Sequence, residues 1–122
     1  MNRECDIEGD FYLFDTQQSG RNTPVLSGYR PIHKLYDNYL STGQHEYSDV
    51  QSVAPGETAK VRAWFVTPEV YPMCLWIGRE IDVMEGPERL VGKLTVTRIV
   101  NETLRGDADL YLRNWVKPDH LD

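Results

Sequence analysis

The sequence predicts an all-β fold, either a sandwich or a barrel, built from short strands. Apolar and polar residues alternate with a period of two in several runs that are rich in Val, Ile, Thr and aromatic side chains. Turn signals that contain glycine or proline separate these runs at intervals of about ten residues, a spacing typical of sandwiches and barrels. Each predicted element follows from one of these two patterns.

The clearest strand signals lie in four runs of the sequence. These are residues 10–16 (DFYLFDT), 61–67 (VRAWFVT), 74–85 (CLWIGREIDVME) and 90–102 (LVGKLTVTRIVNE). The third run is either one long strand or two strands separated at Gly78. In the second run, Val61, Ala63 and Phe65 share one face. If that face is buried, Trp64 on the opposite face points outward.

Turn signals separate the predicted strands. The segments 54–58 (APGET) and 84–89 (MEGPER) combine proline with glycine, and the segment 41–44 (STGQ) carries Gly43. Glycine adopts the positive φ angles that several turn types require, and proline presets the φ angle of the first central turn residue. We therefore expect a turn at each of these segments.

The last part of the chain, about residues 105–122, shows a helical pattern instead. Ala108, Leu112 and Trp115 are spaced i, i+4 and i+7, which places them on one face of a helix. Asp107 is a suitable N-cap, and Pro118 follows the end of the pattern. We expect a short helix that packs on the strands and covers Trp64, with an extended tail as the alternative.

Length and composition indicate one domain, residues 1–122, with no membrane partner. The chain has 122 residues and a net charge of −6, which disfavours non-specific binding to nucleic acid. Cys5 and Cys74 make no disulfide framework, and the N-terminus has no apolar run typical of a signal peptide. No segment is apolar over the length that a membrane span requires. We expect a cytoplasmic protein with reduced thiols.

The segment 19–31, SGRNTPVLSGYRP, contains more glycine, proline and arginine than a simple hairpin needs. It resembles the segment that opens the C-terminal β-barrel, domain III, of elongation factor Tu, in which Gly-Gly-Arg-His-Thr-Pro precedes Gly-Tyr-Arg-Pro. The departures are Ser19 and Asn22, which replace the first Gly and the His. The matching residues are Gly20, Arg21, Thr23, Pro24, Gly28, Tyr29, Arg30 and Pro31.

The resemblance continues in register to about residue 104. The segments 41–47 (STGQHEY), 54–68 (APGETAKVRAWFVTP) and 81–100 (IDVMEGPERLVGKLTVTRIV) are similar to three later blocks of the same domain. The resemblance implies a closed six-stranded antiparallel barrel over about residues 10–104, with the C-terminal tail added. No phosphate-binding Gly-x-x-x-x-Gly-Lys-[Ser/Thr] loop is present in the sequence, so we expect neither a GTPase nor a nucleotide ligand.

The resemblance also suggests where a protein partner binds. In the elongation factor, the region around the Gly-Tyr-Arg-Pro motif faces the GTPase domain, so Arg21, Tyr29 and Arg30 are candidate partner-binding residues. The alternative is that these side chains support the loop of the barrel itself through hydrogen bonds. Trp64 is a further candidate, because tryptophan and arginine are favoured in interface hot spots. Its alternative is burial under the C-terminal helix.

Binding of RNA is the second functional hypothesis. The other side of the family's barrel contacts the T-stem of tRNA, and Thr42 and Gly86 keep two of the groups involved. Ile32 stands where the family has Gln, and Thr67 stands near the family's Lys, so two contacts are lost. RNA binding is therefore disfavoured. It predicts one basic face made by Lys34, Lys60, Arg62 and Lys93.

No residue pattern indicates catalysis or a cofactor. The spacing of His33, His45 and His120 matches no zinc motif. His33 and His45 flank a predicted hairpin and can approach each other, but two ligands do not complete a metal site. Glu80 and Asp82 alternate along a strand, so we expect them on a solvated outer face rather than in acid–base catalysis.

Together these observations predict a non-catalytic, stand-alone barrel similar to domain III of elongation factor Tu. We expect it to act as a protein-interaction module, for example an immunity or regulatory protein linked to translation. The alternative is an RNA-binding module that contacts tRNA-like helices through their shape and backbone.

Overall fold

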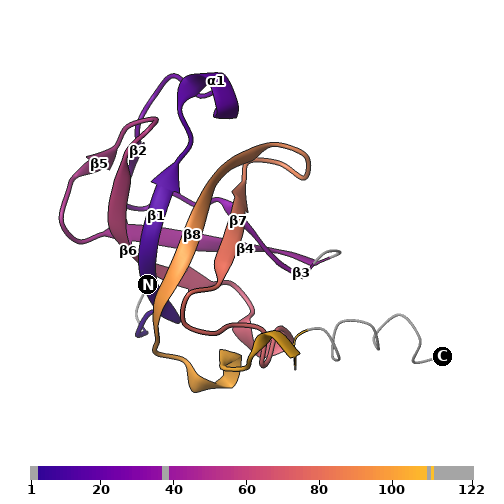
Figure 1. Ribbon diagram of the computed structural model, residues 1–122. Helices are drawn as coiled ribbons and strands as arrows, with labels where there is room; N and C mark the ends of the chain where they lie inside the picture. Colours follow the sequence, from indigo (N-terminus) through magenta and orange to yellow (C-terminus); the bar gives the residue numbers. More distant parts are fainter. Residues whose placement is uncertain (1–2, 37–38, 110, 112–122) are drawn as a thin grey trace.

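A closed antiparallel barrel of six strands, in the order β1-β6-β4-β3-β7-β8, forms the body of the molecule (Figure 1). The structure, a computed structural model, describes residues 3–36, 39–109 and 111. The barrel strands are β1 (Ile7–Leu13), β3 (Ile32–Tyr36), β4 (Tyr39–Tyr47), β6 (Thr58–Phe65), β7 (Glu80–Met84) and β8 (Leu90–Ile99). The predicted all-β class and the closed six-stranded barrel are confirmed.

A small second sheet and three short helices lie in the connections between the barrel strands and directly after β8. Strands β2 (Val25–Leu26) and β5 (Ser52–Val53) pair antiparallel outside the barrel, near the upper ends of β1 and β6 in Figure 1. The helices are α1 (Thr16–Ser19), η1 (Pro68–Val70) and η2 (Glu102–Leu104). The segment 19–31 (SGRNTPVLSGYRP) therefore runs from the end of α1 through β2 to the residue before β3.

The alternation of side chains along each strand fills the barrel. In β6, Val61, Ala63 and Phe65 point inward and are buried, as the sequence pattern predicts. Gly9 of β1 also faces inward, and a Cβ atom there would lie 2.3 Å from the carbonyl oxygen of Thr95 on β8. Glycine at this position therefore allows β1 and β8 to approach closely.

The prediction of a turn at Gly43 is wrong. Strand β4 continues through Gly43 without interruption. A Cβ atom there would lie 2.6 Å from the carbonyl oxygen of Trp64 and 2.7 Å from the ring of His33. This glycine makes room for close packing inside the barrel, a role that single glycines in strands also fill.

Only the second half of the run 74–85 forms a barrel strand. Residues 80–84 make β7, whereas Gly78 has a φ of 93° in a turn closed by a hydrogen bond from Arg79 N to Trp76 O. Cys74 and Leu75 are fully buried before this turn. Burial at the end of the barrel explains their apolar character, and Leu75 forms an isolated parallel bridge with Arg105 instead of joining a barrel strand.

The C-terminal helix is described only at its start. The amide of Tyr111 donates to the carbonyl of Asp107 at 2.9 Å, which is the helical i to i−4 bond. The ring of Tyr111 stacks on Tyr36, with centroids 5.0 Å apart. The predicted positions Leu112, Trp115 and Pro118 lie outside the described residues.

Candidate functional site

The segment 19–31 folds as a turn that is attached to β4. The amide of Tyr29 donates to the carbonyl of Leu26, and Gly28 occupies the turn with a φ of 98°. Gly28 N then donates to His45 O, and His45 N donates back to Tyr29 O, both at 2.8 Å. The Gly-Tyr-Arg-Pro motif is therefore held against β4 by main-chain hydrogen bonds.

Glu85, which directly follows β7, holds two of the candidate side chains. Its carboxylate accepts hydrogen bonds from the Arg21 guanidinium and from the Tyr29 hydroxyl. The guanidinium also lies 5.5 Å from the centre of the Tyr29 ring. Burial, followed by the hydrogen bond to Glu85, raises the pKa of Tyr29. The structure thus places Arg21 and Tyr29 in contacts that support the loop itself.

Arg30 behaves differently from these two neighbours. Tyr29 packs against the core and Pro31 is buried, so strand alternation directs Arg30 outward, where it is exposed. Among the residues that the structure describes, Arg30 is the only arginine with no side-chain hydrogen bond or ion pair. The engaged arginines are Arg3, Arg21, Arg62, Arg79, Arg89, Arg98 and Arg105.

Trp64 points outward but is not available to a partner. Its side chain is 5% exposed, because the N-terminal segment covers it and Trp64 Nε1 donates to Arg3 O at 2.8 Å. Arg3 is itself held by the buried Asp6, whose carboxylate also accepts from Phe65 N at 2.7 Å. Of the two interpretations of Trp64, a covered side chain is therefore the one that holds, and the N-terminal segment supplies the cover expected from the C-terminal helix. Trp115, expected beside it, lies outside the described residues.

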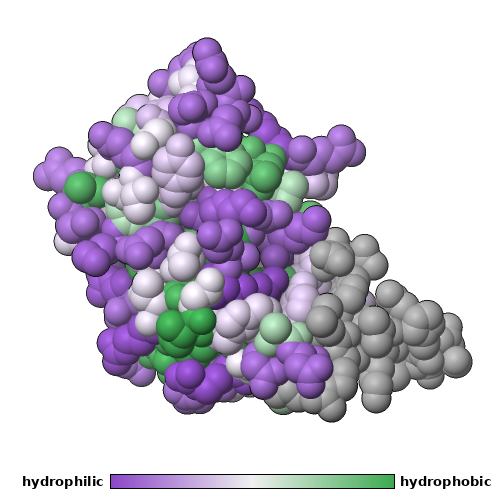
Figure 2. Space-filling model, in the orientation of Figure 1, coloured by the Kyte–Doolittle hydropathy of each residue, from purple (hydrophilic) through white to green (hydrophobic). Residues whose placement is uncertain are grey.

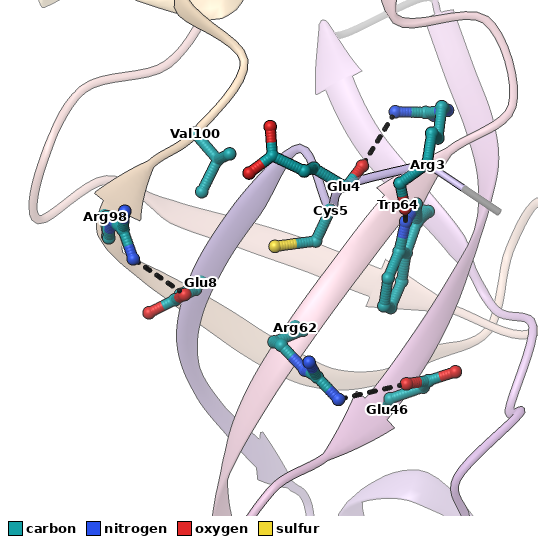
Figure 3. A pocket seen from close by; sticks show the side chains of 9 residues that line it. All are labelled: Arg3, Glu4, Cys5, Glu8, Glu46, Arg62, Trp64, Arg98 and Val100. Atoms are coloured by element: carbon teal, nitrogen blue, oxygen red, sulfur yellow. Dashed lines mark hydrogen bonds and ion pairs between the residues drawn. The ribbon is translucent and has the colours of Figure 1, made fainter. Parts of the chain in front are cut away.

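A polar groove of about 370 Å³ lies beside Trp64 (Figure 3). Two ion pairs line it, Arg98 with Glu8 and Arg62 with Glu46, each at 3.2 Å. The thiol of Cys5 points into the groove, but burial, followed by the charge of Glu8, raises its pKa. A protonated thiol is a poor nucleophile, so Cys5 is not an activated group. The charged side chains of the two ion pairs in the groove balance each other.

Two histidines form a hydrogen-bonded chain inside the barrel. The Nε2 atoms of His33 and His45 lie 2.8 Å apart, which confirms that the two residues approach each other. His33 Nδ1 lies 3.2 Å from the carbonyl oxygen of Ser41, and His45 Nδ1 lies 3.0 Å from the Tyr47 hydroxyl. Because a carbonyl oxygen only accepts, His33 carries its proton on Nδ1 and accepts from His45 at Nε2. Tyr47 then donates to His45, and the chain is complete with both rings neutral.

This histidine pair is part of the core rather than a ligand site. Both side chains are fully buried. Burial lowers the pKa of His33 to about 4, and burial followed by the neighbouring His33 lowers the pKa of His45 well below 6.5. Within the described ranges, no group of three or more His, Cys, Asp or Glu side chains is arranged to hold a metal ion.

The cations that RNA binding would require do not share one face. Lys34 lies on β3, Lys60 and Arg62 on β6, and Lys93 on β8. Strand β4 separates β3 from β6, and β1 separates β6 from β8. Lys34 and Lys93 are nearer to each other, because only β7 lies between them, but the acidic Asp82 of β7 is paired with both positions. Two of the four are also paired with acids, Arg62 with Glu46 and Lys93 with Asp82 at 3.1 Å.

The two RNA-contact candidates also lie on different elements. Thr42 is exposed on β4, and Gly86, with a φ of 78°, lies in the turn after β7. Ile32 of β3 lies between β4 and β7, opposite Thr42 on one side and Met84 on the other. The surface between Thr42 and Gly86 therefore includes the apolar side chain of Ile32.

The surface in the view of Figure 2 is mostly hydrophilic, and its apolar patches are small and separate.

Sequence reasoning missed the two acids that organise the site, Glu85 and Asp6. Each lies far along the chain from groups that it binds, since Glu85 and Arg21 are 64 residues apart. The only sequence signal for Glu85 is its position, as a charged residue directly after the apolar end of a strand.

None of the helices in the described part of the chain is long and apolar enough to cross a membrane. A search against models of known protein families finds no match for this sequence. The relation to domain III of elongation factor Tu therefore stays a prediction from the residues of segment 19–31 and the blocks that follow it.

Proposed function

We propose that this chain is a non-catalytic protein-binding module, a stand-alone barrel similar to domain III of elongation factor Tu, that regulates or protects a component of translation. The observation that supports this proposal is Arg30. Its guanidinium is exposed and unbonded, whereas the main chain beside it is tied to β4. The link to translation rests on the resemblance alone.

A fixed backbone favours Arg30 as a binding residue. Arginine offers five donors in a planar arrangement that matches carboxylates and carbonyls, and it is enriched in interface hot spots. Binding costs less free energy when the backbone that carries the residue is already ordered. The contacts of Glu85 with Arg21 and Tyr29 supply part of this order. They therefore help to fix the backbone that carries Arg30.

We place this function in the cytoplasm. Cys5 and Cys74 are both free, which is the usual state of cysteines in a reducing compartment. The spread of the cations over several strands, with acids beside two of them, gives RNA binding no support.

Affinity capture from a lysate of the source cells tests the proposal. The baits are the wild type, Arg30→Ala, and Arg98→Ala as a matched control in which an exposed arginine is removed from β8. We expect a partner protein that survives nuclease treatment, is retained by Arg98→Ala and is lost with Arg30→Ala. Equal recovery by the wild type and Arg30→Ala, or loss of the partner after nuclease treatment, would overturn the proposal.

A further inference from the structure

One outer strip of the barrel carries two cations, Arg30 and Lys34, that form no ion pair with a described residue. Side chains at positions 30, 32 and 34 alternate with the buried His33 and its neighbours and therefore point outward. Ile32 lies opposite Thr42 and Lys34 opposite Leu40 on β4. The main-chain bonds of Tyr29 and Pro31 to β4 continue this register, which places Arg30 opposite Gln44. We call this strip the β3 face: Arg30, Ile32, Lys34, Leu40, Thr42 and Gln44.

The β3 face concentrates the free cations of an acidic chain. Among the described residues, only three lysines and arginines have neither an ion pair nor a side-chain hydrogen bond, and they are Arg30, Lys34 and Lys60. Two of these three belong to the β3 face. Lys34 lies beside Asp82 on β7, but Asp82 is paired with Lys93 at 3.1 Å. The face itself contains no acid.

The spacing of the two cations defines the chemistry of a matching ligand. Four residues of extended strand span about 13 Å, so Arg30 and Lys34 match two carboxylates at positions i and i+4 of an extended peptide. Ile32 lies midway, and Leu40, which is 36% exposed, lies beside Lys34. An apolar side chain at position i+2 of that peptide would cover this apolar centre.

We infer that the β3 face binds an extended acidic segment of a protein, in which an apolar residue lies midway between two carboxylates. This inference rests on the proposed protein-binding function and specifies the chemistry of the partner. Arg30 forms the bidentate contact, Lys34 supplies a second charge, and Thr42 and Gln44 offer hydrogen bonds to the peptide. RNA fits this face less well, because the face has an apolar centre and no aromatic side chain on which a base can stack.

A titration of the isotopically labelled full chain, followed by amide NMR shifts, tests the inference. The probe is a synthetic peptide of four Glu-Ser-Val-Ser repeats, which places carboxylates four residues apart with valine midway. The matched peptide carries Lys in place of Glu, and a short RNA hairpin is the third ligand. We expect saturable shifts at Ile32, Lys34, Thr42 and Gln44 with the acidic peptide only, and weaker binding at high salt.

Variants of the chain separate this inference from the proposed function. We expect Arg30→Glu combined with Lys34→Glu to weaken peptide binding at least about tenfold, and Lys60→Glu to leave it unchanged. If the double variant fails to fold, Arg30→Gln combined with Lys34→Gln replaces it. Absence of peptide shifts, or shifts elsewhere, overturns the inference, as does stronger binding of the RNA hairpin. The proposed function still stands if Arg30→Ala loses the captured partner while the acidic peptide does not bind.

Discussion

Glu85 binds one of the two arginines in segment 19–31, Arg21, and not the other. Its carboxylate binds Arg21 and Tyr29, and the Arg89 guanidinium lies 3.9 Å from it. Arg30 lies outside this cluster and has no partner among the described residues. The same residue type therefore supports the fold at one position and is free to bind at another.

Substitution of the two arginines should separate these roles. Arg21→Ala removes the charged partner of a partly buried Glu85, so we expect the free energy of unfolding to fall by about 1–3 kcal/mol. Arg30→Ala should change it by less than about 0.5 kcal/mol, because the exposed side chain loses no hydrogen bond or ion pair to a described residue. Urea denaturation of both variants provides the comparison. A larger loss for Arg30→Ala would mean that the exposed guanidinium stabilises the barrel.

The buried histidine pair should make the barrel sensitive to acid. Burial lowers the pKa of His33 to about 4 and that of His45 below 6.5, whereas both residues take up protons near pH 6.5 in the unfolded chain. The stability that they contribute is complete above pH 6.5 and is lost as the pH falls toward 4. The loss should reach about 1.4 kcal/mol per pH unit for each histidine.

Denaturation at several pH values between 7.5 and 4.5 measures this slope. NMR titration of the histidine ring protons serves as the internal check. His33 and His45 should show no titration near pH 6.5 in the folded protein. Ring signals of these two residues that titrate at the ordinary value would contradict the neutral hydrogen-bonded chain.

At the scale of secondary-structure elements, strand β4 organises both the core and the site. Its inner face carries His45 and Gly43, and its main chain holds the Gly-Tyr-Arg-Pro motif. On its outer face, Thr42 and Gln44 flank the row that contains Arg30. A shift in the register of β4 would therefore disturb the histidine chain and the β3 face together.

Gly43→Ala should damage β4 from the inside. The added Cβ would meet the carbonyl oxygen of Trp64 at 2.6 Å and the His33 ring at 2.7 Å, and the first of these is main chain that cannot easily move. We expect a loss of about 1–3 kcal/mol in the free energy of unfolding. Thr42→Ala, at the exposed neighbouring position, is the control and should cost less than about 1 kcal/mol. Equal stability of the two variants would show that the barrel relaxes around position 43.

At the scale of the whole molecule, closure of the barrel joins the first strand to the last. Strand β1 pairs with β6 on one side and with β8 on the other, as Figure 1 shows. The N-terminal segment then crosses the outside of β6, where Asp6 binds Phe65 N and Asn101 at 3.0 Å. Residues from both ends of the barrel sequence thus hold Trp64 out of contact with solvent.

Hydrogen exchange should reflect this closure. Amides of β1 that are bonded to β6 and β8 should exchange most slowly, because their exposure requires the barrel to open. The amides of Gly28 and His45 should also be protected, since both take part in the bonds between the Gly-Tyr-Arg-Pro motif and β4. Hydrogen exchange followed by mass spectrometry or NMR measures both sets. Rapid exchange at Gly28 would contradict a fixed backbone beside Arg30.

Sequence reasoning succeeds where the pattern is local. The period of two in β6 identifies Val61, Ala63 and Phe65 as core residues, and the glycines of the turns mark where strands end. It fails at Gly43, because the same residue type serves in turns and at points of close packing. Only the neighbouring strand distinguishes the two cases.

The sequence by itself determines the all-β class, the inward faces of the main strands and the acidic charge, because these follow from residue types and their spacing. The tertiary structure alone decides that Arg21 is engaged and Arg30 free, that Trp64 is covered, and that His45 donates a hydrogen bond to His33. These outcomes depend on partners that lie far apart along the chain, such as Tyr29 and Glu85, separated by 56 residues. Barrel closure brings such partners together, and no local pattern records which of them will meet.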